Sequence, residues 1–253
     1  MSGSRIRLVT FDILHTLITP RAPIHVQYSA VFEPYLGQLP PEEIKRSFKT
    51  ALKALQIENP AYEQGSQDWW GEVIRRTALG AGANREDASL SDIVASLMKR
   101  FSSREGYRAF DDAIPTIEKL HELKVSTAVV SNSDSRSRSV LEDLGFPAYL
   151  SDTIVLSEEE GIEKPSGEIY RRVLEQVSRK QSLARPLAPD QCLHVGDELK
   201  ADYHGARNIG MEALLLRRLG KDGEQAHVEE DEVLDGVKVV HGLHKVLEYI
   251  EHQ

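Results

Sequence analysis

The chain has 253 residues, a size that fits one large domain or a core domain with a smaller one. Hydrophobic residues make up 40%, which excludes a disordered composition, and a net charge of −9 without a long Lys/Arg run argues against nucleic acid as a partner. The single cysteine, Cys192, excludes an intrachain disulfide. Residues 1–7 lack an apolar signal core and no apolar run would span a bilayer, so we expect a cytoplasmic protein with no membrane partner.

The first predicted element is a buried strand, and a helical stretch follows it. Residues 5–13 end in an apolar, β-branched run that places Asp12 near the carboxyl end of the strand. A proline-bearing turn is expected at residues 19–23. Apolar residues then recur at helical spacing as far as Phe101. The helices predicted there cover residues 24–36, 41–55, 68–79 and 90–101.

From residue 112 onward, predicted helices and strands alternate along the chain. The predicted strands cover residues 127–131, 153–156, 192–195, 213–216 and 237–240. The predicted helices cover residues 112–123, 135–144, 165–177, 199–208 and 243–251. The acidic stretch 224–235 is expected to be an exposed loop.

This alternation predicts an α/β fold, a Rossmann-like parallel sheet covered on both faces by helices. The helical stretch interrupts the pattern after the first strand, so we interpret it as a cap inserted into the core. The expected core is residues 1–18 and 108–253, and the expected helical cap is residues 19–107. Ligands of open α/β sheets bind beyond the carboxyl ends of the strands, so the residues that end the strands are the candidates for function.

Polar groups of complementary type follow several of these strands. Asp12 ends the first strand, Ser131 and Asn132 end the second, and Lys164 precedes Pro165 in the loop after the third. Gly196 and Asp197 end the fourth strand, and Asp202 follows five residues after Asp197. The set combines carboxylates with a lysine and hydroxyl or amide donors, which is the chemistry of a site for a cation and an anion.

These segments resemble, in order, the four motifs of the haloacid dehalogenase superfamily. The matching stretches are FDILHTL, VVSN, EKPSGEIY and VGDELKADYHGA, and the ordered set is far more specific than any one of them. The helical insert after the first motif matches the position of the family's C1 cap. The pair Trp69-Trp70 and the overall layout are similar to one branch of that family.

The resemblance implies an aspartate-centred hydrolase that uses Mg²⁺ and acts on a small phosphorylated metabolite. Asp12 would attack phosphorus and form an aspartyl-phosphate, with Ser131 and Lys164 completing the catalytic set. Lys164, Ser131, Asn132 and the backbone beside Thr16 would bind the phosphoryl group. The implied metal ligands are the side chains of Asp12, Asp197 and Asp202 and the backbone carbonyl of Leu14.

Leu14 is the departure from this pattern, because phosphatases of the family place a second aspartate at that position as the general acid and base. Leucine can neither donate nor accept a proton, and positioned acid–base catalysis is typically worth ~10²–10⁴-fold in rate. Good leaving groups, such as acyl phosphates or phenolates, would suffer less. The adjacent His15 titrates near neutral pH and is a possible substitute.

Three functions therefore stay open from the sequence. The first is a Mg²⁺-dependent phosphohydrolase of low or narrow activity. The second is a non-catalytic descendant that binds a phosphometabolite or a protein. The third is a metal-independent hydrolase of the dehalogenase type, for which Arg46 is a loose candidate for the halide-binding arginine; a phosphonatase would instead need a lysine such as Lys45, Lys49 or Lys53. The sequence carries no signal for the oligomeric state.

Overall fold

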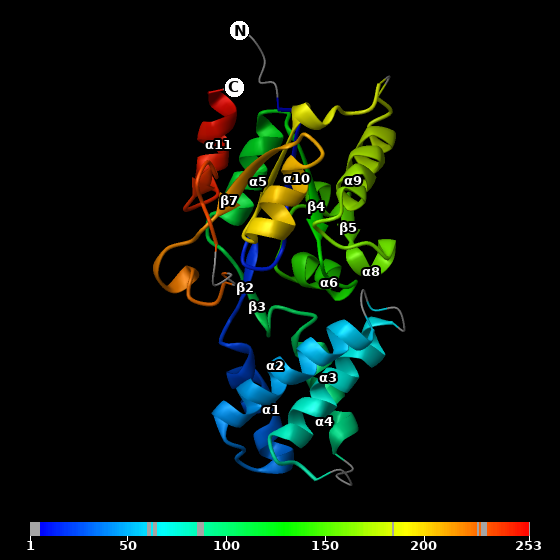
Figure 1. The fold of residues 1–253 in the computed structure, drawn as a ribbon, viewed down its shortest axis with the longest axis vertical. Coiled ribbons are helices and arrows are strands. Elements are labelled where there is room, and N and C mark those ends of the chain that lie inside the picture. Colours follow the sequence, from blue (N-terminus) through cyan, green and yellow to red (C-terminus); the bar gives the residue numbers. More distant parts are fainter. Residues whose placement is uncertain are drawn as a thin grey trace.

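A computed structural model of the protein describes residues 6–59, 62, 65–84, 89–183, 185–226, 228 and 232–252. Its centre is a six-stranded parallel sheet with the strand order β5–β4–β1–β6–β7–β8, which confirms the Rossmann-like sheet expected from the sequence (Figure 1). The strands are β1 (Leu8–Phe11), β4 (Ser126–Ser131), β5 (Ile154–Leu156), β6 (Cys192–Gly196), β7 (Glu212–Leu216) and β8 (Val239–Val240).

Helices cover both faces of the sheet, as a buried parallel sheet requires. Side chains of β1 alternate between the faces, because Val9 and Phe11 join one apolar cluster and Leu8 joins the other. The first face is covered by α5 (Ala113–Glu122), α6 (Arg136–Asp143), α7 (Ala148–Ser151) and α11 (His244–Glu251). The second is covered by α9 (Gly167–Lys180), a π-helical turn at Leu199–His204, and α10 (Gly205–Arg207).

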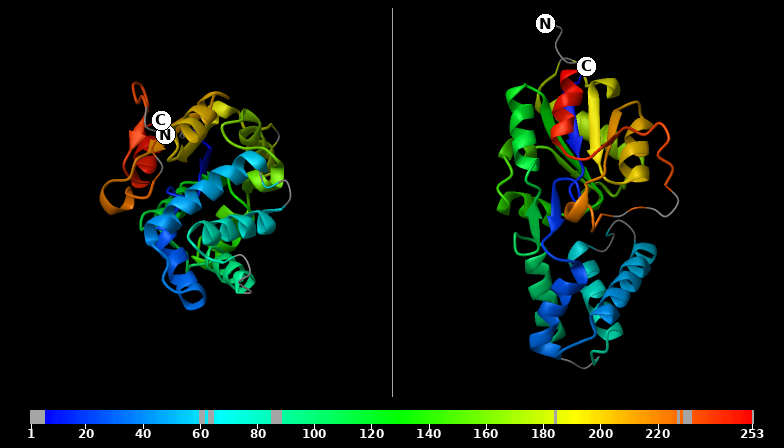
Figure 2. Two further views of the ribbon diagram at one scale, coloured as in Figure 1. Left: turned by 60° about the horizontal axis from the view of Figure 1, so that its bottom comes forward. Right: turned by 90° about the vertical axis from the view of Figure 1, so that its left-hand side faces the viewer.

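Helices α1 (Ile24–Leu36), α2 (Pro41–Glu58), α3 (Ser66–Gly80) and α4 (Leu90–Arg100) form a separate group beyond one end of the sheet (Figures 1 and 2). This α1–α4 segment has its own buried cluster, to which Tyr28, Phe32, Ile44, Ile74 and Leu97 belong. The helices occur where the sequence predicts them, because each carries its apolar residues at helical spacing.

Two chain crossings join the α1–α4 segment to the sheet. They form a two-stranded antiparallel sheet from β2 (Ile18–Pro20) and β3 (Tyr107–Ala109), with Ile18 opposite Ala109. The expected boundaries at residues 18/19 and 107/108 fall within these two strands. The division into core and cap stays a prediction.

The sequence interpretation was wrong in two local details. Residues 19 and 20 of the turn expected at 19–23 belong to β2, because their partner strand lies almost ninety residues further on and no local pattern reveals it. The helix expected at 199–208 begins as the π-helical turn, which alters the direction of its side chains, and only Gly205–Arg207 is α-helical. The short helices α7 and α8 (Ser157–Glu160) were not expected. In the part of the chain that the structure describes, no helix has the length and apolarity needed to cross a bilayer.

Candidate active site

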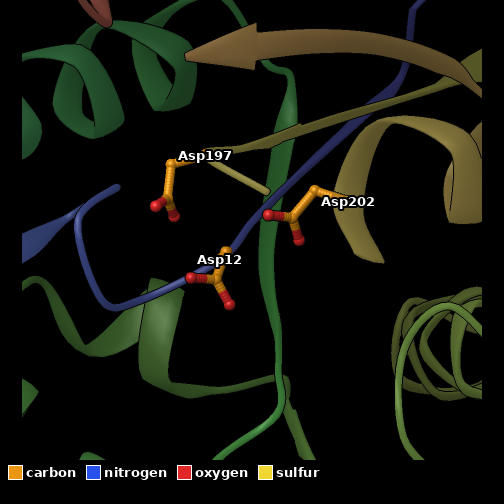
Figure 3. Close-up of side chains that lie close together, drawn as sticks. All are labelled: Asp12, Asp197 and Asp202. Carbon is orange, nitrogen blue, oxygen red and sulfur yellow. The ribbon is translucent and has the colours of Figure 1, made fainter. Parts of the chain in front are cut away.

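Three neighbouring strands bring the motif residues to one edge of the sheet. Phe11 of β1 lies level with Val129 of β4 and Val195 of β6, so the residues that follow these positions reach the same height. The backbone N–H of Asp12 donates to the carbonyl of Val195 at 2.9 Å. Ligand oxygens of Asp12, Asp197 and Asp202 all lie within 4.8 Å of one another, and Figure 3 shows these carboxylates gathered beside the end of β1.

Lys164 lies between two of these carboxylates. Its Nζ donates to Oδ1 of Asp12 at 2.5 Å and to Oδ1 of Asp202 at 2.6 Å, and its side chain is only 2% exposed. Asn132 fixes the backbone of Lys164 from both sides, because its Oδ1 accepts from the Lys164 N–H at 2.7 Å and its Nδ2 donates to the Lys164 carbonyl at 2.9 Å. The amide of Asn132 thus positions the lysine, and its predicted contact with substrate stays a prediction.

Asp202 is held on every side by hydrogen bonds. Oδ2 accepts from the backbone N–H of Glu198 at 2.8 Å, and Oδ1 accepts from Lys164 and from His194. Asp202 and Lys164 stabilise each other in the closed interior, since a buried charge needs both a counter-charge and hydrogen bonds. Direct metal coordination by Asp202 stays a prediction, and in this structure the carboxylate positions the lysine.

His194 is a polar residue inside an otherwise apolar strand, and it is fully buried. Its Nε2 lies 3.1 Å from Asp202 Oδ1, and its Nδ1 lies 2.8 Å from the hydroxyl of Thr10. Because a carboxylate only accepts hydrogen bonds, Nε2 is the donor in the first contact. This link to the site was missed from the sequence, although a histidine among Leu193, Val195 and other apolar residues was a signal for it.

Thr16 and Ser131 take places close to the nucleophile. The Thr16 hydroxyl donates to Oδ1 of Asp197 at 3.3 Å, and both residues are buried. Ser131 is 3% exposed and ends β4 beside the Asp12 carboxylate, whose pKa it lowers. The structure therefore brings Asp12, Thr16, Ser131, Lys164 and Asp197 together, and their catalytic, phosphate-binding and metal-binding roles stay predictions.

The charges of this cluster do not balance within the protein. Burial raises the pKa of Asp12, and it raises the pKa of Asp197 well above the ordinary value, with a further increase from the neighbouring carboxylates. Burial opposes ionisation of Asp202 as well, but the Lys164 ammonium and the His194 hydrogen bond outweigh it and lower that pKa. Three buried carboxylates share one lysine, and the uncompensated charge lies on Asp12 and Asp197.

A hard divalent cation would fit this donor set. The available ligand atoms are carboxylate oxygens, which Mg²⁺ prefers, and Asp12 and Asp197 are the two without a full counter-charge. The sequence predicts Asp12, Asp197, Asp202 and the Leu14 carbonyl as the groups that would hold the ion, and of these the charge pattern favours Asp12 and Asp197. The ion would lower the cost of keeping both carboxylates ionised.

Two arginines that the sequence analysis did not single out hold the loops of the site. Arg217 donates to the carbonyl of Asp197 and forms an ion pair with Glu232 at 2.6 Å. Arg218 donates to the carbonyl of Thr16 at 3.0 Å and pairs with Asp112. Both arginines follow the carboxyl end of β7, and that position was the available signal.

The carboxylates of Asp12 and Asp197 line a chamber of about 720 Å³ between the sheet and the α1–α4 segment. Leu14 and His15 lie on its lining beside Asp12, and the side chain of Leu14 is 41% exposed there. Proton transfer by His15 stays a prediction. Trp69 is buried within the α1–α4 segment, whereas Trp70 reaches across the chamber and donates to Asp134 at 2.8 Å.

The fold and the site define an α/β protein with a Rossmann-like parallel sheet and an aspartate at the end of its first strand. Residues 6–210 match the family model described as haloacid dehalogenase-like hydrolase, and the chain belongs to that family. The branch to which Trp69-Trp70 pointed is the haloacid dehalogenase-like hydrolase domain-containing protein 3. Proteins of that name are 30% identical in Bos taurus, over 84% of this chain and 82% of the relative, and 30% identical in Danio rerio, over 88% and 89%.

Solved structures share the fold at lower identity. A 2-haloacid dehalogenase from Pseudomonas syringae is 22% identical with a TM-score of 0.64, covering 98% of this chain and 99% of its own. A HAD phosphatase from Thermococcus onnurineus is 20% identical with a TM-score of 0.60, covering 96% and 97%. The magnesium-bound HAD-hydrolase YfnB from Bacillus subtilis is 19% identical with a TM-score of 0.66, covering 98% and 99%. The fold thus accommodates dehalogenases and a phosphatase, and the choice between them must come from the site.

Proposed function

We propose that this protein is a Mg²⁺-dependent phosphohydrolase that acts on a small phosphorylated metabolite through an aspartyl-phosphate. The observation that carries the proposal is the charge pattern: Lys164 is shared by Asp12 and Asp202, while Asp197 lies in the same cluster and forms no ion pair with a described residue. A site that only removes halide has no need for the second, uncompensated carboxylate. A site that binds a cation and a phosphate dianion has a use for each of these groups.

In the proposed reaction, an Oδ atom of Asp12 forms a bond to phosphorus and the bond from phosphorus to the leaving oxygen breaks. Lys164 and Ser131 donate to phosphoryl oxygens and reduce their repulsion with the attacking carboxylate. Water then attacks the phosphorus of the aspartyl-phosphate, which releases inorganic phosphate and restores Asp12. Bound Mg²⁺ would supply charge neutralisation at the phosphoryl oxygens.

The dehalogenase alternative has less support from the chamber. Arg46, the candidate for binding halide, is 72% exposed, forms an ion pair with Glu43 and is absent from the described lining of the chamber. Lys45, Lys49 and Lys53, the candidates for a phosphonatase, are also absent from that described lining. Activity on a 2-haloacid that survives a chelator would revive the dehalogenase hypothesis.

Hydrolysis of a panel of phosphate esters and acyl phosphates with Mg²⁺ tests the proposal. We expect turnover that requires Asp12, is absent in Asp12→Asn and is removed by a chelator. If wild type and Asp12→Asn are equally inactive on every compound, the phosphohydrolase proposal fails. Calorimetry that shows Mg²⁺-dependent binding of phosphate without turnover would then favour the non-catalytic alternative, for which the apolar Leu14 is the motivating observation.

A further inference from the structure

The chamber has a polar floor and an apolar wall. Asp12, Ser131, Lys164 and Asp197 form the floor, and the opposite wall comes from the α1–α4 segment and its connection to β3. Its volume of about 720 Å³ lies in the range of pockets that enclose small organic ligands. The apolar side chains of this wall include Ile24, Phe48, Leu52, Trp69, Trp70 and Phe101.

Of the two tryptophans on this wall, Trp69 is buried and Trp70 is partly exposed, and both indole N–H groups already have acceptors within the protein. The indole N–H of Trp69 donates to the carbonyl of Asn59 at 2.9 Å, and that of Trp70 donates to Asp134 at 2.8 Å. The two indole rings meet edge to face, with centroids 4.9 Å apart, so their positions are fixed. The wall therefore offers aromatic side chains to a flat apolar group, beside the polar groups of Gln56, Asn59, Tyr62 and Tyr107.

The charges on the lining disfavour a second anion on the substrate. Beyond the floor, the described lining carries the carboxylates of Asp134, Glu163 and Glu198 and one permanent cation, Arg136. That guanidinium is engaged, because its Nε and Nη2 each donate to Asp134 at 2.8 Å and its Cζ lies 4.8 Å from the ring centroid of Trp70. A carboxylate or second phosphate on the leaving group would lie among these acidic side chains, and the Arg136 guanidinium is already paired with Asp134.

Leu14 adds a requirement on the leaving oxygen. It lies on the chamber lining beside Asp12, where an acid would protonate the departing group, and it has no proton to give. An alkoxide is a poor leaving group without that proton, whereas a phenolate leaves more easily. The aromatic wall and the missing acid thus point to the same chemical class.

From these contacts we infer that the substrate class is an aryl phosphate monoester whose ring carries no acidic group. The inference rests on the proposed phosphohydrolase function and names its substrate. Asp12 forms a bond to phosphorus, the bond between phosphorus and the aryl oxygen breaks, and the phenolate leaves with the electron pair and takes a proton from water. Hydrolysis of the aspartyl-phosphate completes the reaction, so the ester and one water give a phenol and inorganic phosphate.

Three substrates test this inference on the full chain with Mg²⁺: phenyl phosphate, cyclohexyl phosphate and 4-carboxyphenyl phosphate. We expect kcat/KM for phenyl phosphate to exceed that for cyclohexyl phosphate by at least ~10²-fold, because the alkoxide lacks an acid. We also expect phenyl phosphate to exceed 4-carboxyphenyl phosphate by about tenfold, although the carboxylated phenolate is the better leaving group. Leaving-group reactivity alone would make 4-carboxyphenyl phosphate the faster of the two aryl esters, whereas the charges of the chamber would make it the slower.

A pair of neighbouring residues on α2 gives a matched control. Gln56 lies on the chamber lining, whereas Ile57 is 74% exposed and is not part of the described lining. Gln56→Arg adds a cation inside the chamber and should raise the ratio of 4-carboxyphenyl to phenyl phosphate turnover roughly threefold to fivefold. Ile57→Arg adds the same charge to the same helix outside the chamber and should leave the ratio unchanged.

The outcomes separate the inference from the function on which it rests. Absence of Asp12-dependent turnover of all three esters would overturn the phosphohydrolase function itself. Asp12-dependent turnover in which cyclohexyl phosphate matches phenyl phosphate, or the carboxylated ester is the better aryl substrate, would overturn the substrate class and leave the function standing. An equal effect of Gln56→Arg and Ile57→Arg would show that the chamber wall does not discriminate charge.

Discussion

The backbone of Gly196 lies directly against the carboxylate of Asp202. A Cβ atom at position 196 would stand 2.1 Å from Cγ of Asp202 and 2.2 Å from its Oδ2. No side chain fits at that distance, so glycine at the end of β6 is a condition for the ion pair between Asp202 and Lys164. The lack of space for a Cβ atom beside Asp202 thus explains why the fourth motif has glycine at position 196.

We therefore expect Gly196→Ala to displace Asp202, to abolish Asp12-dependent hydrolysis and to lower the free energy of unfolding by about 1–3 kcal/mol, the usual cost of overpacking. Chemical denaturation and the phosphatase assay measure the two effects. Gly71→Ala, within α3, is the matched control. A Cβ at position 71 would lie at ordinary contact distances of 3.6 Å from Val94 and 3.7 Å from Arg75. Wild-type turnover in Gly196→Ala would contradict the steric argument.

Leu14→Asp should restore the missing proton donor. Because Leu14 is 41% exposed, we expect a change in stability of only about 0.5 kcal/mol. Turnover of alkyl phosphates should rise by up to ~10²–10⁴-fold, and turnover of phenyl phosphate should change much less. Leu14→Asn is the control, since its amide is similar in shape and transfers no proton; equal rates in the two variants would rule out acid–base catalysis as the cause.

Lys164→Met should remove the ammonium that the buried carboxylates of Asp12 and Asp202 share. Lys164 is 2% exposed, and breaking a buried ion pair typically costs about 3–5 kcal/mol. We expect a loss of that order in the free energy of unfolding together with loss of hydrolysis. Lys119→Met is the comparison, because Lys119 and Glu122 form a pair on the surface and the unfolding midpoint should barely move. Similar losses in the two variants would count against a buried charge cluster.

Mg²⁺ should stabilise the protein more at about pH 8 than at about pH 5. The pKa of Asp197 is raised above 3.8 by burial and by its acidic neighbours, so the metal-free folded state holds a proton that the unfolded state has released. Stability of the metal-free protein therefore falls as the pH rises from the ordinary to the raised pKa. Mg²⁺ competes with that proton for the Asp197 carboxylate, so the stabilisation by Mg²⁺ grows as the pH rises and the proton leaves.

The measurement is the unfolding temperature with Mg²⁺ and with a chelator at both pH values. Asp197→Asn cannot ionise and should lose most of the pH dependence of the Mg²⁺ effect. A gain from Mg²⁺ that is equal at the two pH values in the wild type would contradict the assignment of the raised pKa to this cluster.

The sequence by itself determined the parallel α/β sheet and the identity of the residues at its carboxyl edge. Apolar runs and helical spacing are local properties, and the rule that parallel strands end at one edge places Asp12, Ser131 and Asp197 together. The tertiary structure decided what each group faces. Lys164 forms ion pairs with Asp12, 152 positions away in the chain, and with Asp202, 38 positions away. His194 is hydrogen bonded to Asp202, and Trp70 donates a hydrogen bond to Asp134 from another part of the chain. Side-chain contacts between segments so distant depend on how the elements pack, which no local pattern records.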